Sequence, residues 1–289
     1  MNRRHFLQTA ALAAGATTTA VAAAIADAKT PADTSGSFLQ AASPDHRGKL
    51  TPEEFASVLK RIGAPALDLL HIGRVPFWQK LGIGCSLAHG ATRVMDGYNK
   101  RANHARYIAT ETRAIEACAK LGVPNIICFS GRRNKGQSDE EGLEACAEAL
   151  RTLAPIAEKA KVTLVMELLN STVNQPGYQA DHTAWGVELA KRVGSERFKL
   201  LYDIYHMQIM EGNIIRTIRA NYQYIGHYHT AGVPTHGEFE PNDDNEVNYA
   251  AVARAIRKTG FRGYIGHEYS LTRDPEKSIE AAVRIFREA

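Results

Sequence analysis

The sequence has few cysteines and no marked excess of one charge. Its 289 residues include four cysteines, and its 35 lysines and arginines nearly balance its 31 aspartates and glutamates. The cysteines form no C-x-x-C pair and no dense framework, so we expect buried free thiols rather than disulfides or a cysteine-rich metal site. The small net charge of +4 is evenly spread and gives no basis for nucleic-acid binding. The four cysteines are Cys85, Cys118, Cys128 and Cys146.

The first residues are typical of an export signal. Arg3 and Arg4 precede an apolar, alanine-rich run that ends in a small-residue cleavage site, Ala-Asp-Ala, at 26–28. The paired arginines resemble a twin-arginine signal, so residues 1–28 are predicted to direct a folded protein to the periplasm. Threonine and glycine dilute the apolar run, and no stop-transfer flank follows, so no stable membrane anchor is expected after cleavage. Residues 29–37 are small and polar and are interpreted as a linker.

Strand and helix patterns alternate through the rest of the chain. Short apolar runs predict eight strands, at 38–43, 66–72, 82–90, 125–131, 163–170, 198–206, 224–232 and 263–270. Helices are predicted at 51–62, 99–121, 138–159, 181–193 (capped by Asp181), from 213, at 247–259 and from 274. This alternation predicts parallel βαβ units and an α/β fold, most simply a (β/α)₈ TIM barrel over residues 38–289. A doubly wound sheet is the alternative, but no glycine-rich phosphate loop follows any predicted strand.

Ionisable residues stand near the C-terminal ends of the last four predicted strands. They are Glu167, Asp203, His229 and Glu268, at the edge where parallel α/β folds carry their functional groups. His227 and His229 share one strand face, and His229 is nearer the strand end. Buried carboxylates and imidazoles are costly unless they are paired or bind a metal. Three carboxylates and one imidazole suit a divalent cation such as Mn²⁺ or Mg²⁺, and Co²⁺ also fits.

These residues lie in motifs that resemble a known family. The motifs are VMELLN, ADHTAW, YDIYHMQIMEG, NYQYIGHYHTAG and GHEYS. Over about residues 50–289 the chain resembles the hydroxypyruvate isomerase family, which belongs to the xylose isomerase-like TIM barrels. The resemblance implies that Glu167, Asp203, His229 and Glu268 bind the metal and that the two glutamates form the acid–base pair. It also implies that His206 contacts the substrate.

Two departures from the family concern the substrate. Well-known bacterial hydroxypyruvate isomerases carry glutamine where His229 stands, whereas related ketose 3-epimerases carry histidine. In many relatives the loop after the seventh strand reads like N-P-G-R-H-E, with an arginine near the substrate. Here residues 233–238 read V-P-T-H-G-E, and His236 is the candidate replacement for that arginine.

The chemistry follows from the two glutamates. One carboxylate can remove the proton beside the carbonyl of an α-hydroxy carbonyl compound, and a carboxylate can return it to the neighbouring carbon. This isomerisation is the favoured function, and the resemblance implies hydroxypyruvate and tartronate semialdehyde as the pair. Return of the proton to the opposite face of the same carbon would instead make a ketose 3-epimerase. Further substrate-binding candidates are His89, His236 and Arg132, because a guanidinium there, or that of Arg133, would bind a substrate carboxylate.

Two functions of other classes are alternatives. An abasic-site endonuclease would need more histidine ligands and a basic face, and neither is evident. A non-catalytic sugar-binding protein would be indicated by loss of Glu167 or Glu268, yet both are present. The expected partner is therefore a small hydroxy-carbonyl or sugar substrate and not a nucleic acid. The sequence leaves a homo-oligomer open.

Overall fold

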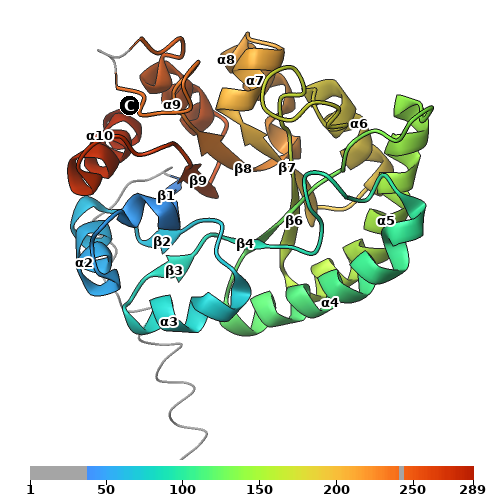
Figure 1. The fold of residues 1–289 in the computed structure, drawn as a ribbon, viewed down its shortest axis with the longest axis horizontal. Helices are drawn as coiled ribbons and strands as arrows, with labels where there is room; N and C mark the ends of the chain where they lie inside the picture. The colour runs from blue at the N-terminus through green and yellow to red at the C-terminus, as the bar shows by residue number, and fades with distance from the viewer. Residues whose placement is uncertain (1–37, 241–243) are drawn as a thin grey trace, which may run out of the picture. The chain divides into compact units, whose positions relative to one another are not determined.

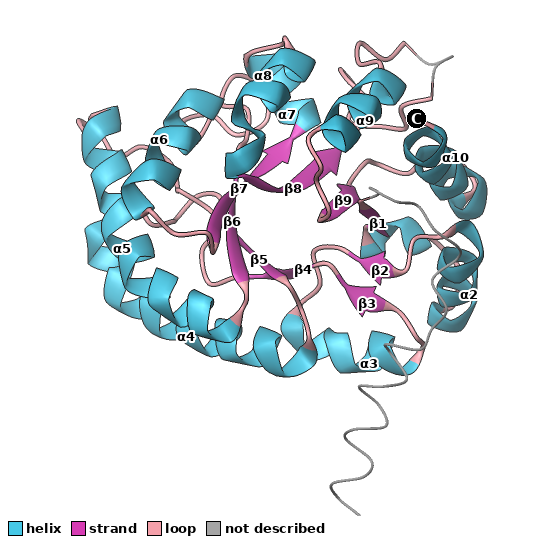
Figure 2. Ribbon diagram, turned by 180° about the vertical axis from the view of Figure 1, so that it is seen from behind, coloured by secondary structure: helices cyan, strands magenta, loops and turns pink. Residues whose placement is uncertain are grey.

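The computed structural model describes residues 38–240 and 244–289, so the predicted export signal and linker lie outside the described residues. Within this part, nine strands form one sheet in the order β3-β2-β1-β9-β8-β7-β6-β5-β4, and all paired neighbours are parallel. The strands line the centre and the helices surround them (Figure 1 and Figure 2). The strands are β1 (Leu39–Ala42), β2 (Ala66–Leu67), β3 (Gly84–Cys85), β4 (Leu87–His89), β5 (Asn125–Cys128), β6 (Thr163–Glu167), β7 (Phe198–Asp203), β8 (Ile225–Thr230) and β9 (Tyr264–His267).

The sheet closes on itself through the third predicted strand. Ser86 separates β3, which pairs with β2, from β4, which pairs with β5. Leu70 bridges to Ala88, and its N–H donates to the carbonyl of Leu87 at 3.1 Å. The eight predicted strands are therefore present, with one of them divided, and the predicted TIM barrel is confirmed over the doubly wound alternative.

Helices connect the strands and cover the outside of the sheet. Capping boxes at Thr51 and Ser138 begin α2 and α5, as the sequence predicts, because each hydroxyl accepts the N–H of a glutamate three residues on. None of the helices in the described residues is long and apolar enough to span a membrane. The helices are α2 (Pro52–Ile62), α3 (Val75–Lys80), α4 (His104–Leu121), α5 (Asp139–Ala160), α6 (Thr183–Val193), α7 (Ile204–Met210), α8 (Ile214–Asn221), α9 (Tyr249–Lys258) and α10 (Pro275–Glu288).

Three predicted boundaries near the site are wrong. The strand predicted at 66–72 ends at Leu67. The strand predicted at 198–206 ends at Asp203, whose side chain accepts the N–H of His206 at 3.1 Å and begins α7. His206 is thus a helical residue and not a strand residue. Asp181 does not cap α6 either, because the N-cap is His182 and Asp181 binds other side chains.

The barrel interior is packed by a small apolar layer beneath the strand ends. This layer consists of Leu87, Ile127, Val165 and Leu201. Val165 and Leu201 lie two residues before the acidic ends of β6 and β7, so alternation along each strand places those acids on the same inner face. The four cysteines are buried free thiols, as predicted.

Candidate metal centre and active site

Strand register brings the four predicted ligands together. Glu167 and Asp203 are the last residues of β6 and β7, His229 lies near the end of β8, and Glu268 directly follows β9. Asp203 pairs with His229, and His229 pairs with Gly266, two residues before Glu268. Each side chain therefore reaches the same level of the barrel, at the carboxyl ends of the strands.

The four side chains form one compact cluster. Their ligand atoms all lie within 4.8 Å of one another. Nδ1 of His229 lies 2.7 Å from Glu268 Oε2 and 3.1 Å from Glu167 Oε1. It lies 3.8 Å from Asp203 Oδ2. One imidazole nitrogen thus faces three carboxylates.

The three carboxylates of the cluster carry more negative charge than its single imidazole can offset. Burial raises the pKa of Glu167 to about 8. Burial alone would lower the pKa of His229, but Glu268, Asp68 and Glu167 raise it well above its usual value. His229 then lowers the pKa of Glu268 in spite of burial. A proton on His229 offsets the carboxylates here, and a divalent cation held by these three carboxylates and one imidazole would replace it, so the donor set fits Mn²⁺ or Mg²⁺.

Asp68 supports the cluster from behind and was not predicted from the sequence. Its Oδ2 accepts hydrogen bonds from Nε2 of His227 and from Nε2 of His229, both at 2.9 Å. Its Oδ1 accepts the hydroxyl of Ser86. Burial alone would raise the pKa of Asp68, but the two imidazoles lower it, so this buried residue is ionised. A carboxylate bound to Nε2–H leaves Nδ1 of His229 free to bind a metal.

The backbone makes room for Asp68. The chain bends directly after it, because Leu69 adopts a left-handed conformation with φ of 51°. Gly266 faces the carboxylate, and a Cβ at that position would lie 1.9 Å from Asp68 Oδ2. Only glycine therefore fits opposite this aspartate. In the sequence, the only sign of a role for Asp68 is that an ionisable residue interrupts the apolar run ALDLLHI.

A cavity of about 510 Å³ opens beside the cluster. Glu268 lines it, and so do the predicted substrate-binding residues His89 and His236. The other cluster residues are not among its lining residues. Glu268 therefore connects the candidate metal centre with the space for a ligand.

His206 lies next to this cavity and not in its wall. Its ring is 6.3 Å from that of His236, centre to centre. Its Nδ1 accepts the N–H of Asn170 at 3.1 Å. Burial lowers the pKa of His206, so it is a neutral imidazole that carries its proton on Nε2.

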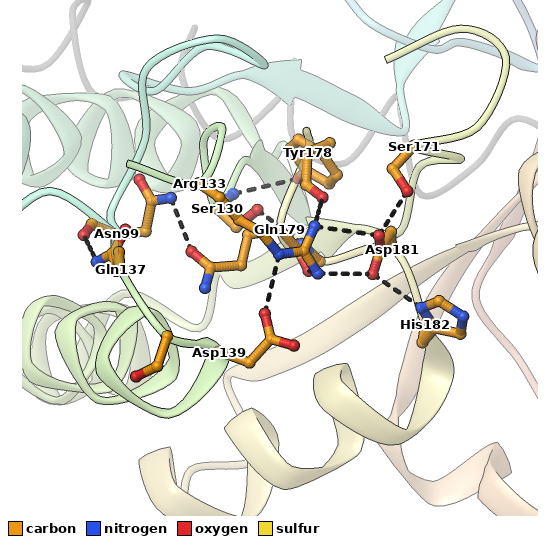
Figure 3. Close-up of polar contacts among 12 residues, drawn as sticks. Asn99, Ser130, Arg133, Gln137, Asp139, Ser171, Tyr178, Gln179, Asp181 and His182 are labelled. Atoms are coloured by element: carbon orange, nitrogen blue, oxygen red, sulfur yellow. Dashed lines mark hydrogen bonds and ion pairs between the residues drawn. The ribbon is translucent and has the colours of Figure 1, made fainter. Parts of the chain in front are cut away.

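The two candidate arginines differ in their surroundings. Arg133 donates to Asp139 at 2.9 Å and to both oxygens of Asp181 at 3.2 Å (Figure 3). It therefore holds the loops after β5 and β6 together and is not available for a substrate. Arg132 makes no ion pair among the described residues, and its buried Nε has no hydrogen-bond partner. Arg132 does not line the cavity.

Glu111 is a second buried acid that was not predicted from the sequence. Burial raises the pKa of Glu111, on α4, to about 7. Its Oε2 accepts the N–H of Ala91 at 2.8 Å and the hydroxyl of Tyr98 at 3.0 Å. Glu111 thereby holds the loop after β4. It belongs neither to the four-residue cluster nor to the group that Asp68 forms with His227 and His229.

Comparisons with known proteins agree with this fold. A family model for the Xylose isomerase-like TIM barrel matches residues 78–289. The hydroxypyruvate isomerase of Escherichia coli (strain K12) is 32% identical over 171 residues, 59% of this chain and 63% of that protein. The 2-oxo-tetronate isomerase of Cupriavidus necator is 32% identical over 168 residues, 57% of this chain and 62% of that protein. These alignments span less than two thirds of either relative.

A solved structure gives the same barrel. The AP endonuclease, family 2, from Brucella melitensis has a TM-score of 0.72 at 22% identity, covering 84% of this chain and 97% of that chain. At this identity the likeness concerns the fold alone.

Proposed function

This chain belongs to the Xylose isomerase-like TIM barrel family, and we propose that it is a metal-dependent isomerase of α-hydroxy carbonyl compounds. The observation that carries the proposal is the cluster of three carboxylates and one imidazole, with Glu268 at the edge of the cavity. The name of the Escherichia coli relative makes hydroxypyruvate, converted to tartronate semialdehyde, the first reaction to test. A divalent ion held by Glu167, Asp203, His229 and Glu268 would supply a Lewis acid that polarises the substrate carbonyl.

The protein's own residues move the proton. Glu268 is assigned as the base that removes the proton beside the carbonyl, because its side chain is 33% exposed and lines the cavity. The electron pair of the broken C–H bond forms the enediolate of the substrate. Return of a proton to the adjacent carbon, with transfer of the hydroxyl proton to the former carbonyl oxygen, completes the isomerisation with no net change in oxidation. Glu167, whose side chain is 7% exposed and whose Oε1 lies 3.1 Å from the same Nδ1 of His229, is the second proton-transfer group.

Epimerisation of a ketose is a second candidate. It uses the same residues, since the proton then returns to the opposite face of the same carbon. The cavity volume favours it, because 510 Å³ exceeds what a three-carbon acid fills and lies in the range of about 300–1,000 Å³ found for larger ligands.

The test separates proton removal from product formation. Glu167→Gln and Glu268→Gln keep the size of the side chain and one oxygen ligand but remove the base. We expect each to lose turnover by about 100-fold or more. Exchange of the substrate C–H proton with D₂O should disappear in Glu268→Gln, whereas Glu167→Gln should keep exchange and lose product. Near wild-type turnover in both variants, with metal bound, would refute the mechanism.

The place of action is a further part of the proposal. The paired arginines and the small-residue cleavage site support export to the periplasm. The polar residues at 29–37 support a mature protein that begins near Lys29.

A further inference from the structure

The wall of the cavity beside Glu268 carries no fixed positive charge. None of the described residues that line it is a lysine or an arginine. Its ionisable residues are two carboxylates, those of Asp45 and Glu268, and the three imidazoles of His46, His89 and His236. Ser43 and Ser270 add hydroxyl groups. The wall therefore offers hydrogen bonds and negative charge, but no counter-charge for an anion.

The nearby arginines do not line the cavity, although burial and then the charge of Arg93 lower the pKa of the wall residue His89. Arg273 is paired with Glu240, Arg133 with two aspartates, and Arg93 donates to the carbonyls of residues 90–92. Arg132 makes no ion pair within residues 38–240 and 244–289, but it follows β5, whereas most of the cavity wall comes from the segments after β1 and β9.

Two of the three histidines of the wall, His46 and His236, are held in place. The Nε2–H of His46 donates to the carbonyl of Tyr269 at 2.8 Å. Burial lowers the pKa of His46, so it is neutral. The backbone of His236 adopts a left-handed conformation with φ of 58°. Its N–H donates to Gly232 and its carbonyl accepts from Ser270, both at 2.7 Å. A non-glycine residue fixed in this conformation is typical of functional sites.

We propose that this cavity receives the uncharged, hydroxyl-bearing end of the substrate, so that the protein prefers a neutral sugar longer than three carbons to a three-carbon acid. The inference rests on the proposed function, because it places the reacting end beside Glu268. A substrate carboxylate in this wall would meet the carboxylate of Asp45, with no lysine or arginine in the wall to offset the repulsion. Hydroxyl groups would instead bond to the imidazoles and serines, which both donate and accept.

The test uses three kinds of substrate that separate charge from length. The mature, Mn²⁺-loaded protein is incubated in D₂O, and proton NMR follows exchange at the carbon beside the carbonyl. Hydroxypyruvate and dihydroxyacetone have the same length and differ in charge. Dihydroxyacetone and the four D-2-ketohexoses are all neutral and differ in length. We expect kcat/KM for exchange to rise at least tenfold from hydroxypyruvate to dihydroxyacetone, and at least tenfold again to one of the ketohexoses.

The results distinguish failure of the proposed substrate preference from failure of the proposed isomerase function. Fastest exchange with hydroxypyruvate would overturn the charge inference and leave the proposed function standing. Equal exchange of dihydroxyacetone and all ketohexoses would overturn the length inference. No exchange with any compound, while metal analysis shows a bound ion, would overturn the proposed function as well.

A matched pair of variants tests the wall directly. His236→Arg places a guanidinium in the cavity wall, and His236→Gln keeps hydrogen bonding without a charge. We expect the arginine variant to raise the ratio of hydroxypyruvate to dihydroxyacetone exchange at least tenfold, and the glutamine variant to leave that ratio within twofold. An unchanged ratio in a folded arginine variant would overturn the proposal, because the non-reacting end of the substrate would then not lie against this wall.

Discussion

Asp68 offers a test of how the barrel holds its candidate metal ligand. Replacing it with asparagine keeps the size of the side chain, and one amide oxygen can still accept from both Nε2–H groups, as Asp68 Oδ2 does at 2.9 Å. The amide NH₂ then faces Ser86, whose hydroxyl also donates to the carbonyl of Leu67 and can accept in return. Asp68→Asn therefore removes the negative charge and leaves most of the geometry.

The size of the effect follows from what the charge does. A carboxylate behind a metal-binding imidazole raises the basicity of that ligand, and its loss typically weakens metal binding about 10–100-fold, or about 1.4–2.7 kcal/mol. We expect Asp68→Asn near the lower end, because the tautomer of His229 is retained. We expect Asp68→Ala near the upper end, because both imidazoles lose their buried partner.

The assay is titration of the metal-free protein with Mn²⁺ by calorimetry. Asp181→Asn is the matched control, because Asp181 is about as buried and also bonds a histidine. It belongs neither to the four-residue cluster nor to the group of Asp68 and its two histidines. We expect the control to bind Mn²⁺ within twofold of wild type. Wild-type affinity in both Asp68 variants would refute the idea that Asp68 acts through His229.

Gly266 provides an independent check of the same idea. A methyl group there would lie 1.9 Å from Asp68 Oδ2, so Gly266→Ala must displace the carboxylate and should weaken Mn²⁺ binding about as much as Asp68→Ala. If the two act through one contact, the double variant should bind no more weakly than the worse single variant. Fully additive losses would show that the glycine acts in another way.

Three further predictions concern stability and export. Because burial raises the pKa of Glu111 from 4.5 to about 7, the folded state holds this proton more tightly, and the stability it contributes is lost as the pH rises through about 7. In urea unfolding, Glu111→Gln should therefore gain about 2.5 kcal/mol relative to wild type between about pH 5 and about pH 8, and a constant difference would contradict the shift. Arg133→Gln should lower the free energy of unfolding by about 2 kcal/mol, since charged hydrogen bonds are lost, and should leave Mn²⁺ affinity within twofold. Arg3→Lys with Arg4→Lys should leave uncleaved protein in the cytoplasm, and normal export of this variant would reject the twin-arginine assignment.

The strands and the acidic residues at their ends could be predicted because both follow from patterns of neighbouring residues in the sequence. Parallel strands buried on both faces read as short apolar runs. An acid that interrupts such a run must face a site or a partner, and this argument identified Glu167 and Asp203. The end of the strand at Asp203 was not predicted. The side chain of Asp203 accepts the N–H of His206, which ends the strand and begins a helix. The same side chain that points to the candidate metal centre also begins the next helix.

Asp68 was missed for a different reason. Its partners His227 and His229 lie 159 and 161 residues away in sequence, so no local pattern links them. Asp68 interrupts the apolar run ALDLLHI as visibly as Asp203 interrupts its own run. However, β2 is only two residues long, so the strand offers no other polar residue that would mark Asp68 as part of a site. Likewise, nothing in the dipeptide Arg132-Arg133 shows which arginine is paired, because that depends on Asp181 in the loop after the next strand.

One group of strands therefore carries most of the candidate metal ligands, and another group borders the cavity. Strands β6, β7 and β8 carry Glu167, Asp203 and His229, which are almost fully buried and are held by fixed partners. The ends of β1, β2 and β9 border the cavity, and Glu268, the most exposed member of the cluster, is the member that also lines it. A substitution in the first group should alter metal binding for every substrate. A substitution in the cavity wall, such as at His236, should alter the choice of substrate and leave metal binding intact, which is how one barrel can keep its proton chemistry while its substrates change.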